Sequence, residues 1–519
     1  MKLDRLKIKS RFKNLSDFEI DFDKDSSTTV VVGRNGTGKS NLLEALTIIF
    51  RDLDLGERPL FGYELDYVCR GKLVRIDADP QRRQHSGYSV TVDDSPLTFN
   101  KFREAPGREF LPNYIFGYYS GPSDRMEEHY LKHQERFYRD LLAGKDQPLR
   151  PLFYARPVHS QFVLLAFFME QEPEVLDFLR EHLWIEGLDY ALFVMRQPPW
   201  TSRQGDARFW NARGVVSDFL DKLYELALAP LRLKLRIPIG FRKTTQAEHL
   251  YLYLKDLADI RNLARKYDSQ QAFFKALEST YISRLISEVR MNVKARKVDG
   301  SLTFRELSEG EQQLLMVLGL LRFTREEESL FLLDEPDTHL NPAWSIRYLE
   351  FLRSIGGAQE TSHIIMVTHD PLVIAGLTKS EVQILDRDEE SGRVTAKLPD
   401  QDPRGMGVAA LLTSEVYGLR SQLDLDTLQA LDRKRQLASK DDLSDEERVQ
   451  LRDLDQRLGH LDFTLSARDP LYEQFVRAMS QRQREAGLTE PVLSPQQQEE
   501  VRDLALQVIR ELTPGEEAS

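Results

Sequence analysis

Residues 28–50 read TTVVVGRNGTGKSNLLEALTIIF, and this stretch decides the fold. Its first part, Thr28–Val32, is a short β-branched run without polar alternation, which is typical of a strand buried on both faces. After a glycine-rich turn, apolar residues recur at helical spacing over Ser40–Phe50, as Leu42, Leu43, Leu46 and Ile49. A buried strand, a glycine turn and an amphipathic helix in this order predict an α/β fold.

The turn between this strand and helix matches the phosphate-binding pattern G-x-x-x-x-G-K-[ST]. The residues predicted to bind a nucleotide are Gly33, Arg34, Asn35, Gly36, Thr37, Gly38, Lys39, Ser40 and Asn41. The glycines let successive backbone N–H groups point into one concavity, at a helix N-terminus where the dipole favours anions. We expect Lys39 to reach the β- and γ-phosphates of ATP, and the Ser40 hydroxyl to bind Mg²⁺.

Two later buried strands are also predicted to end in polar residues. The run at 328–333 leads into Asp334 and Glu335, and two adjacent carboxylates there are costly to bury without a cation. We expect Asp334 to hold Mg²⁺ through water, and Glu335 to polarise the water that attacks the γ-phosphate. The run at 363–367 leads into Thr-His-Asp, which predicts that His369 lies beside the γ-phosphate as a sensor and charge stabiliser.

A fourth motif lies shortly before the Asp-Glu strand. Leu307–Gln313 (LSEGEQQ) opens a predicted helix, with Ser308 as N-cap and Glu311 as its capping-box partner. With GRNGTGKS, FLLDEPDTHLNP and VTHD in this order, the chain resembles the ATP-binding-cassette (ABC) superfamily over residues 1–170 and 290–395. The resemblance implies an ABC-type head, in which a mixed β-sheet with a phosphate-loop core is joined by an antiparallel β subdomain.

The resemblance also implies a mechanism. ABC heads pair head to tail, and each ATP lies between the phosphate loop of one head and the signature motif of the other. Ser308 and Gly310 would then complete the site of a partner copy. Lys39, Glu335 and His369 would act catalytically in the head that carries them.

The predicted metal site combines Ser40, Asp334 and a glutamine. ABC proteins carry a glutamine that touches the metal and senses the γ-phosphate, and Gln161 in ARPVHSQFVLLAFF is the candidate here. His159, two residues earlier, is interpreted as an ordinary surface residue.

Two residues depart from the family's pattern. Glu309 replaces a signature glycine, and its charge near a partner's phosphates is unfavourable unless Arg34 or Arg305 offsets it. Asn341 replaces an aspartate that helps the two sites communicate, which puts their coupling in doubt.

The insertion between the motifs indicates the branch of the superfamily. Lys39 and Ser308 lie 269 residues apart, and no heptad run occurs between them. A transporter cassette has a shorter stretch there, and a chromosome-maintenance head inserts a long coiled coil. The chain instead resembles the PtuA-type ATPases of Septu and some retron anti-phage systems, which work with a separate HNH nuclease. This resemblance implies a homo-oligomer with a nuclease partner.

We predict four segments: a head N-lobe (1–170), an inserted, mainly helical lobe (171–289), a head C-lobe (290–399) and a helical region for oligomerisation or partner docking (400–519). The alternation within the first thirty residues predicts a β-hairpin. Further strands are predicted at Lys72–Asp77, Tyr88–Val92, Tyr114–Tyr119 and Leu231–Ile237. Helices are predicted at 423–440, 444–459, 471–485 and 494–512, with capping boxes at Ser444/Glu447 and Ser494/Gln497.

Composition narrows the possible partners and location. The 519 residues are 41% hydrophobic and 30% charged, with a formal net charge of −12, which argues against a nonspecific nucleic-acid binder. Residues 230–300 nevertheless hold 15 Lys and Arg against 7 Asp and Glu. This excess of positive charge has two interpretations, a solvated surface or a surface that contacts nucleic acid. No apolar run reaches the roughly 18 residues of a membrane span, and no export signal is visible. Cys69 is the only cysteine, so a disulfide within the chain is excluded, and we expect a cytoplasmic protein.

The primary hypothesis is an ABC-type ATPase that acts as sensor and scaffold of an anti-phage complex and uses ATP to restrain or release a nuclease. One alternative resembles the RecF family of DNA-repair ATPases and would clamp duplex DNA with residues 230–300. Another is a nucleotide-gated assembly module with little turnover, which Asn341 and Glu309 favour. An embedded nuclease would need acidic residues at strand ends, and Asp386–Asp388 (DRD) is interpreted instead as an acidic turn.

Overall fold

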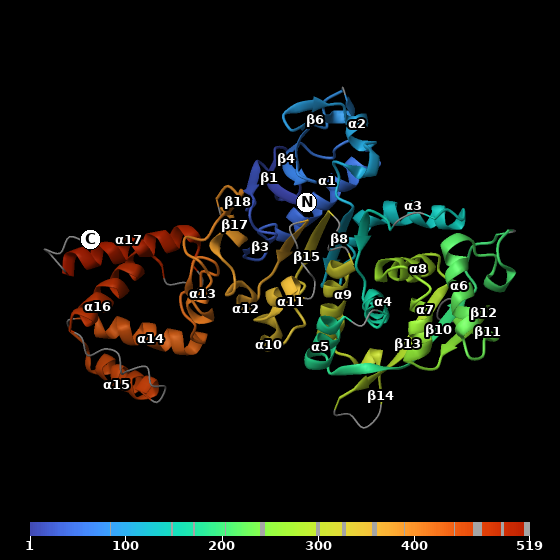
Figure 1. The fold of residues 1–519 in the computed structure, drawn as a ribbon. Coiled ribbons are helices and arrows are strands. Elements are labelled where there is room, and N and C mark those ends of the chain that lie inside the picture. The colour runs from blue at the N-terminus through green and yellow to red at the C-terminus, as the bar shows by residue number, and fades with distance from the viewer. Residues whose placement is uncertain are drawn as a thin grey trace. The chain divides into compact units, whose positions relative to one another are not determined.

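The computed structural model describes most of the chain (Figure 1). The described residues are 1–83, 85–146, 149–169, 172–202, 204–238, 244–296, 301–323, 328–354, 361–388, 390–440, 442–459, 470–488 and 493–512. Contacts divide the chain into two compact units, Met1–Gly376 with Ser380–Leu398, and Leu377–Lys379 with Pro399–Ser519. None of the described helices is both long and apolar enough to cross a lipid bilayer.

A seven-stranded sheet forms the centre of the first unit, with the order β18-β17-β3-β16-β15-β8-β9. Its strands are β3 (Thr28–Gly33), β8 (Tyr114–Tyr119), β9 (Leu152–Tyr154), β15 (Ser329–Asp334), β16 (Ser362–Val367), β17 (Val382–Arg387) and β18 (Val394–Lys397). All neighbours pair in parallel except β17 and β18. Every residue of β15 and β16 is buried, which explains their continuous apolar runs. The predicted α/β fold is confirmed, as are the predicted strands that form β3, β8, β15 and β16, whereas β9, β17 and β18 were not predicted.

Helix α1 (Lys39–Leu55) lies between this sheet and a second one. It contacts β3, β15 and β16 on one side, and Phe50 meets Tyr67 of β4 edge to face at 5.5 Å on the other. The second sheet is antiparallel, with the order β2-β1-β4-β5-β6-β7. Its strands are β1 (Lys2–Ile8), β2 (Phe18–Asp21), β4 (Tyr63–Cys69), β5 (Lys72–Ala78), β6 (Tyr88–Val92) and β7 (Ser95–Leu97), followed by α2 (Phe99–Arg103). The antiparallel pairing of β1 with β2 confirms the predicted hairpin.

The inserted lobe contains a third sheet, of which only the strand at Leu231–Ile237 was predicted, although helices still cover more of residues 171–289 than strands do. Its order is β11-β12-β10-β13-β14, all antiparallel. The strands are β10 (Ile185–Arg196), β11 (Leu231–Pro238), β12 (Thr244–Leu254), β13 (Ile286–Ala295) and β14 (Ser301–Thr303). The helices in this part of the chain are α3 (Leu131–Leu142), α4 (Val158–Phe167), α5 (Pro173–His182), α6 (Gly214–Leu226), α7 (Leu257–Ala264) and α8 (Gln270–Ile282). Strand β10 is largely buried on both faces, and such an apolar run cannot be told from a buried helix by its period.

A buried ion pair network joins α4 and α8. Glu278 of α8 is fully buried and accepts hydrogen bonds from Arg150 (2.7 Å) and from Nε2 of His159 (2.9 Å). His159 is only 1% exposed, so its interpretation as a surface residue is wrong. The lobe is therefore tied to the head through α4, which also packs against α9 (Glu309–Phe323).

The remaining elements of the first unit are α10 (Pro342–Ser345), α11 (Tyr348–Ser354) and α12 (Pro371–Ile374). The acidic turn starts at Asp388 rather than Asp386, because Asp386 and Arg387 still pair with β18.

The second unit is helical in its described part. It contains α13 (Val408–Thr413), α14 (Leu425–Ala438), α15 (Asp445–Gly459), α16 (Pro470–Glu485) and α17 (Pro495–Leu512), and the last four agree with the predicted ranges to within two residues. Both predicted capping boxes form: Ser444 exchanges hydrogen bonds with Glu447, and Ser494 with Gln497.

Candidate active site

The carboxyl ends of four parallel strands meet at one edge of the seven-stranded sheet. Asp334 at the end of β15 lies opposite Val367 of β16 and Tyr119 of β8, and β16 also pairs with β3. The phosphate loop after β3, the Thr-His-Asp segment after β16 and the Asp-Glu pair after β15 therefore share this edge. The strand order thus brings together three motifs that are far apart in the sequence, as is usual for ligand sites on parallel sheets.

The phosphate loop requires glycine at two positions. Gly33, Gly36 and Gly38 have φ angles of 146°, 85° and 98°. A Cβ at Gly33 would lie 2.2 Å from the Leu385 carbonyl oxygen, and one at Gly38 would lie 2.9 Å from the side chain of Asn14. Side chains are therefore excluded from both places, and α1 begins directly after Gly38 with its N-terminus at the loop.

Lys39 lies inside this loop and is only 6% exposed. Its ammonium group donates to the carbonyl oxygens of Gly33 (2.8 Å) and Arg34 (3.0 Å), and the Thr37 hydroxyl also donates to Arg34 (2.8 Å). Burial lowers the pKa of Lys39 to about 8, although the nearby Asp-Glu pair acts in the opposite direction. A poorly solvated ammonium group in a glycine loop fits the phosphates of a nucleotide.

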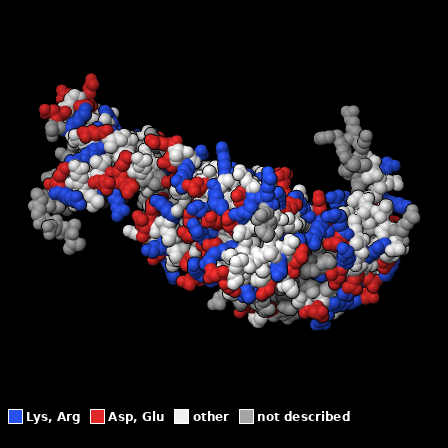
Figure 2. Space-filling model, turned by 90° about the horizontal axis from the view of Figure 1, so that it is seen from above, with Lys and Arg blue, Asp and Glu red and all other residues white. Residues whose placement is uncertain are grey.

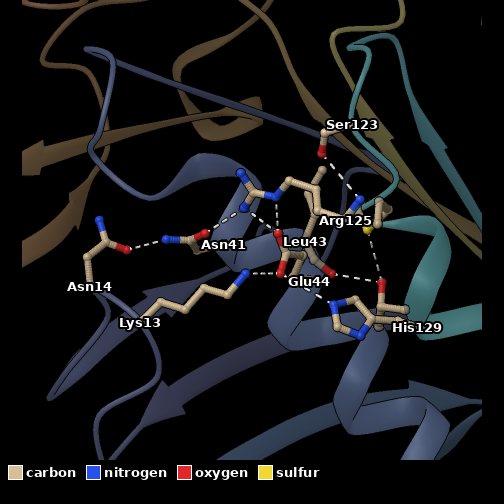
Figure 3. Close-up of polar contacts among 10 residues, drawn as sticks. Lys13, Asn14, Asn41, Leu43, Glu44, Ser123, Arg125 and His129 are labelled. Carbon is tan, nitrogen blue, oxygen red and sulfur yellow. Dashed lines mark hydrogen bonds and ion pairs between the residues drawn. The ribbon is translucent and has the colours of Figure 1, made fainter.

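A chain of hydrogen bonds supports the phosphate loop from outside (Figure 3). Arg125 donates to the side-chain oxygen of Asn41 (2.7 Å), and the Asn41 amide donates to Asn14 (2.6 Å). Asn14 donates in turn to the carbonyl oxygen of Gly36 (3.0 Å). The side chain of Asn41, which was predicted to bind the nucleotide, therefore bonds to protein groups. Arg125 and Asn14 lie outside every motif, and no sequence pattern identified them.

The buried carboxylate of Glu44 anchors this chain (Figure 3). Glu44 is 1% exposed and forms ion pairs with Lys13 and Arg125, while Nε2 of His129 lies 3.4 Å away. Burial alone would raise the pKa of Glu44, but hydrogen bonds from His129 and Lys13 and the charge of Arg125 lower it to about 2. Arg125 is thereby fixed between α1 and the loop that it supports.

The Asp-Glu pair combines a buried and an accessible carboxylate. Asp334 is 2% exposed and forms a hydrogen bond with Ser40, and burial raises the pKa of Asp334 to about 6. Glu335 has a φ of 53°, and its N–H donates to the carbonyl oxygen of Val367 (2.9 Å). Its side chain is 40% exposed, and Nε2 of His369 lies 3.6 Å from its carboxylate. A left-handed conformation of a residue other than glycine is a strain that is concentrated at functional sites.

The Thr-His-Asp segment places His369 next to this pair. Burial and the Lys39 charge lower the pKa of His369, while Glu335 raises it. The preceding Thr368 donates through its hydroxyl to Asp337, whose pKa burial raises to about 6. The segment is therefore fixed to the loop that follows the Asp-Glu pair.

The signature motif starts α9 as predicted. Ser308 and Glu311 form the predicted capping box, with the Ser308 N–H donating to the Glu311 carboxylate (2.6 Å) and the Glu311 N–H donating to Ser308 Oγ (3.2 Å). Gly310 approaches the loop after β15 so closely that a Cβ there would lie 2.4 Å from the His339 carbonyl oxygen.

The two departures from the family pattern have structural partners. The side chain of Glu309 is 80% exposed and lies 3.4 Å from Nδ1 of His339, whereas Arg305 pairs with Glu288 (2.5 Å). Asn341 caps α10, because its side chain accepts a hydrogen bond from a backbone N–H of that helix (3.0 Å).

The role predicted for Gln161 as a metal ligand stays a prediction. Gln161 lies within α4, and among the described residues no polar contact joins it to the phosphate loop or to Asp334. Ser120 occupies the place after β8, where its N–H donates to the Asp334 carbonyl oxygen (3.2 Å). Gln313 of α9 donates to the Glu335 carbonyl oxygen (3.5 Å). Gln313, which belongs to the motif LSEGEQQ, therefore contacts the Asp-Glu pair. The sequence did not predict this contact.

The residues at the edge fit a magnesium nucleotide. Ser40 and Asp334 would offer two oxygen ligands close together, and burial raises the pKa of Asp334 to about 6, although Ser40, Arg125 and Lys39 act in the opposite direction. Among the described residues, no group of three or more His, Cys, Asp and Glu side chains forms a metal site by itself. Magnesium would take its other ligands from phosphate and water, as it commonly does.

Comparison with known proteins agrees with this geometry. The chain is 29% identical over 197 residues to the Septu protein PtuA of Bacillus mycoides (strain KBAB4). The aligned part covers 36% of this chain and 27% of that protein, so the likeness spans about a quarter of the relative's length. The profile of the family described as "AAA domain, putative AbiEii toxin, Type IV TA system" matches residues 28–375. Because this match covers more than half of the 519 residues, the chain belongs to that family of AAA-domain proteins.

Proposed function

We propose that the protein hydrolyses ATP and that it does so as the sensor and scaffold subunit of a prokaryotic anti-phage complex. The observation that carries the first part is the meeting of the phosphate loop, the Asp-Glu pair and His369 at one sheet edge. Membership of the AAA-domain family supports nucleotide binding at this place.

Each residue of the site has a role that its position suits. Lys39 neutralises charge on the β- and γ-phosphates, and Glu335 positions and polarises the attacking water. His369, 3.6 Å from Glu335, stabilises charge on the γ-phosphate. Ser40 and Asp334 hold Mg²⁺, which supplies charge compensation at the phosphate oxygens.

We further propose that ATP is held between two heads. The exposed residues Ser308 and Glu309 at the start of α9 support this arrangement, because a partner's phosphates would meet the helix N-terminus at Ser308, next to the buried Gly310. ATP then forms part of the interface, and its hydrolysis removes a bridging ligand.

The likeness to the Septu protein PtuA supports a role in defence. By this proposal the ATPase controls a separate nuclease of the HNH type, restraining or releasing it with the nucleotide state. The helical second unit would serve oligomerisation or docking, since Leu425, Val449 and Leu506 expose 57%, 50% and 45% of their surfaces there. Replacing these three by serine should then weaken assembly in sedimentation experiments.

Glu335→Gln tests the catalytic assignment. The amide cannot accept a proton from water, so turnover should fall by about 10² to 10⁴-fold while ATP still binds, and ATP-dependent dimers should accumulate. Glu499→Gln is the matched control, because this exposed residue of α17 lies outside the site. Steady-state ATPase rates and analytical ultracentrifugation with and without ATP provide both readouts. Wild-type turnover and assembly in Glu335→Gln would exclude Glu335 as the base.

The DNA-repair alternative is weakened by ion pairing within the inserted lobe. Arg232 pairs with Glu248 (3.0 Å), Lys266 with Glu225 (2.5 Å) and Lys294 with Asp189 (3.3 Å), so much of the positive charge in this part is compensated. We therefore expect duplex DNA to leave the ATPase rate unchanged, whereas a DNA clamp would show stimulation that falls steeply with salt.

A further inference from the structure

A cavity lined by many basic residues lies away from the phosphate loop. This cavity, of about 910 Å³, opens between α3, the segment before β8 and the segment before β9. Six of its fifteen lining residues are Lys or Arg, two are Asp, and none belongs to the phosphate loop. The volume suits a small organic ligand, and the excess of positive charge selects an anion.

Two buried polar side chains of this cavity lack a hydrogen-bond partner at one nitrogen. His133 is 3% exposed and Arg150 is 4% exposed, and both line the cavity. Among the described residues, neither Nδ1 of His133 nor Nε of Arg150 has a partner. A buried nitrogen without a partner is costly, so these two atoms, which lie just beneath the cavity surface, add to the positive character of this lining.

The rest of the protein holds these two side chains in place. Nε2 of His133 lies 2.8 Å from the Asp54 carboxylate, which also pairs with Arg108. Burial alone would raise the pKa of Asp54, but the hydrogen bond from His133 and the charge of Arg108 lower it to about 2. The Arg150 guanidinium bonds to Glu278 and lies 4.5 Å from the centre of the Phe153 ring. The nitrogens without partners are therefore fixed rather than free to turn away.

Two arginines with free charge complete the cavity. Arg136 and Arg139 lie on α3, which packs beside α8 (Figure 1), and both side chains are exposed. Neither forms an ion pair within the described part of the chain. Other basic residues of the lining are compensated: Lys145 pairs with Asp140 (2.9 Å), and Arg103 with Glu104 (2.8 Å). Uncompensated charge is thus concentrated on Arg136 and Arg139.

We infer that this cavity binds a nucleotide phosphate, either of a free nucleotide or of the 5′ end of a nucleic-acid strand. Arg136 and Arg139, the two exposed arginines of the lining that form no ion pair in the described part of the chain, pair with the phosphate oxygens. The rings of Tyr114 and Phe137 contribute aromatic surface to the same cavity, to which a base can pack.

The test uses the full chain with Lys39→Ala, so that the phosphate loop contributes little to binding. AMP is titrated by calorimetry, and a short fluorescent DNA single strand is titrated by polarisation with and without a 5′-phosphate. The Arg136→Ala/Arg139→Ala protein is compared with Arg448→Ala/Arg452→Ala, a pair of exposed arginines on α15. Loss of two charged contacts should weaken binding by at least about tenfold, and the control pair should not.

The two probes distinguish the sources of the phosphate. If AMP binds and the 5′-phosphate does not change the affinity for the DNA strand, the ligand is a free nucleotide. If the phosphorylated strand binds more tightly than the unphosphorylated one, the ligand is the 5′ end of a strand. The inference is overturned if neither probe binds, or if the α3 variant binds as tightly as its control. Both results are independent of the ATPase assay, because they do not require turnover.

Discussion

At the scale of single residues, the candidate site holds two buried charged groups whose pKa values are shifted in opposite directions. Burial lowers the pKa of Lys39 to about 8 and raises that of Asp334 to about 6, so each charged form is poorly compensated in the protein alone. In the proposed function, a magnesium nucleotide would supply partners for both groups: phosphate oxygens for Lys39 and the cation for Asp334. The site is thus organised in advance for charges that it does not contain.

Arg125→Met tests the hydrogen-bond chain that supports the phosphate loop. It removes the contact from Arg125 to Asn41, and with it the support that reaches Gly36 through Asn14. We expect the KM for ATP to rise by roughly threefold to tenfold, the range of one or two hydrogen bonds, with little change in kcat.

Lys13→Met is the matched control for this prediction. Lys13 also pairs with Glu44, but it has no contact with Asn41 among the described residues. ATPase kinetics of the two variants therefore separate the loss of charge at Glu44 from the loss of loop support. Equal KM values in both would contradict a role for the Asn41 link.

At the scale of elements, the sequence predicted where strands and motifs occur better than it predicted which strands and helices lie next to each other. The runs that became β3, β15 and β16 are short, apolar and bounded by polar residues, so their period and their ends are visible in the chain. Which strand lies beside β15 is a matter of topology, and β8 occupies that place. Gln161 was chosen from its local sequence alone, and it lies in a helix that packs on α8 and α9.

The inserted lobe shows the same limit of prediction from a single sequence. Residues of β10 read as an apolar run because both faces of this strand are covered, and the partners that cover them come from distant segments. Long-range contacts of this kind, like the hydrogen bond between His159 and Glu278, leave no local pattern in a single sequence.

Glu278→Gln tests how α4 and α8 are joined. Removing this carboxylate leaves the charge of Arg150 buried without a partner, so the free energy of unfolding should fall by about 3 to 5 kcal/mol at pH 7. Glu225→Gln is the control, because its pair with Lys266 is exposed and should contribute about 1 kcal/mol or less. Urea unfolding followed by circular dichroism measures both.

The buried carboxylate of Glu278 also predicts how the free energy of unfolding depends on pH. Burial raises the pKa of Glu278, but the charges of His159 and Arg150 outweigh it and lower the value to about 2, against an ordinary value of 4.5. The stabilisation is therefore fully present above pH 4.5 and is lost as the pH falls toward 2. The difference between the wild type and Glu278→Gln should shrink between pH 5 and pH 3. A difference that stays constant over this interval would show that Glu278 is not ionised in the folded protein.

At the scale of the whole molecule, the net negative charge argues against a general polyanion binder. Lys and Arg are interspersed with Asp and Glu over the face shown in Figure 2, and the net charge is −12. We therefore expect specific contacts, rather than a broad electrostatic field, to select the partners of this protein. The composite site proposed between two heads is a contact of this kind, since each copy would supply a phosphate loop and a signature to the other.

Mixing two inactive variants tests this pairing. Lys39→Ala damages the phosphate loop, and Ser308→Arg places a bulky side chain at the signature that would face a partner's nucleotide. In a head-to-tail dimer, a mixed pair joins the intact loop of one copy to the intact signature of the other, so one of its two sites is complete. Equal amounts should recover roughly a quarter of the wild-type ATPase rate, because half of the dimers are mixed. Lys39→Ala mixed with Lys39→Ala/Ser308→Arg is the control and should stay inactive. If the first mixture is no more active than its separate components, each head works with its own signature or alone, and the paired arrangement is wrong.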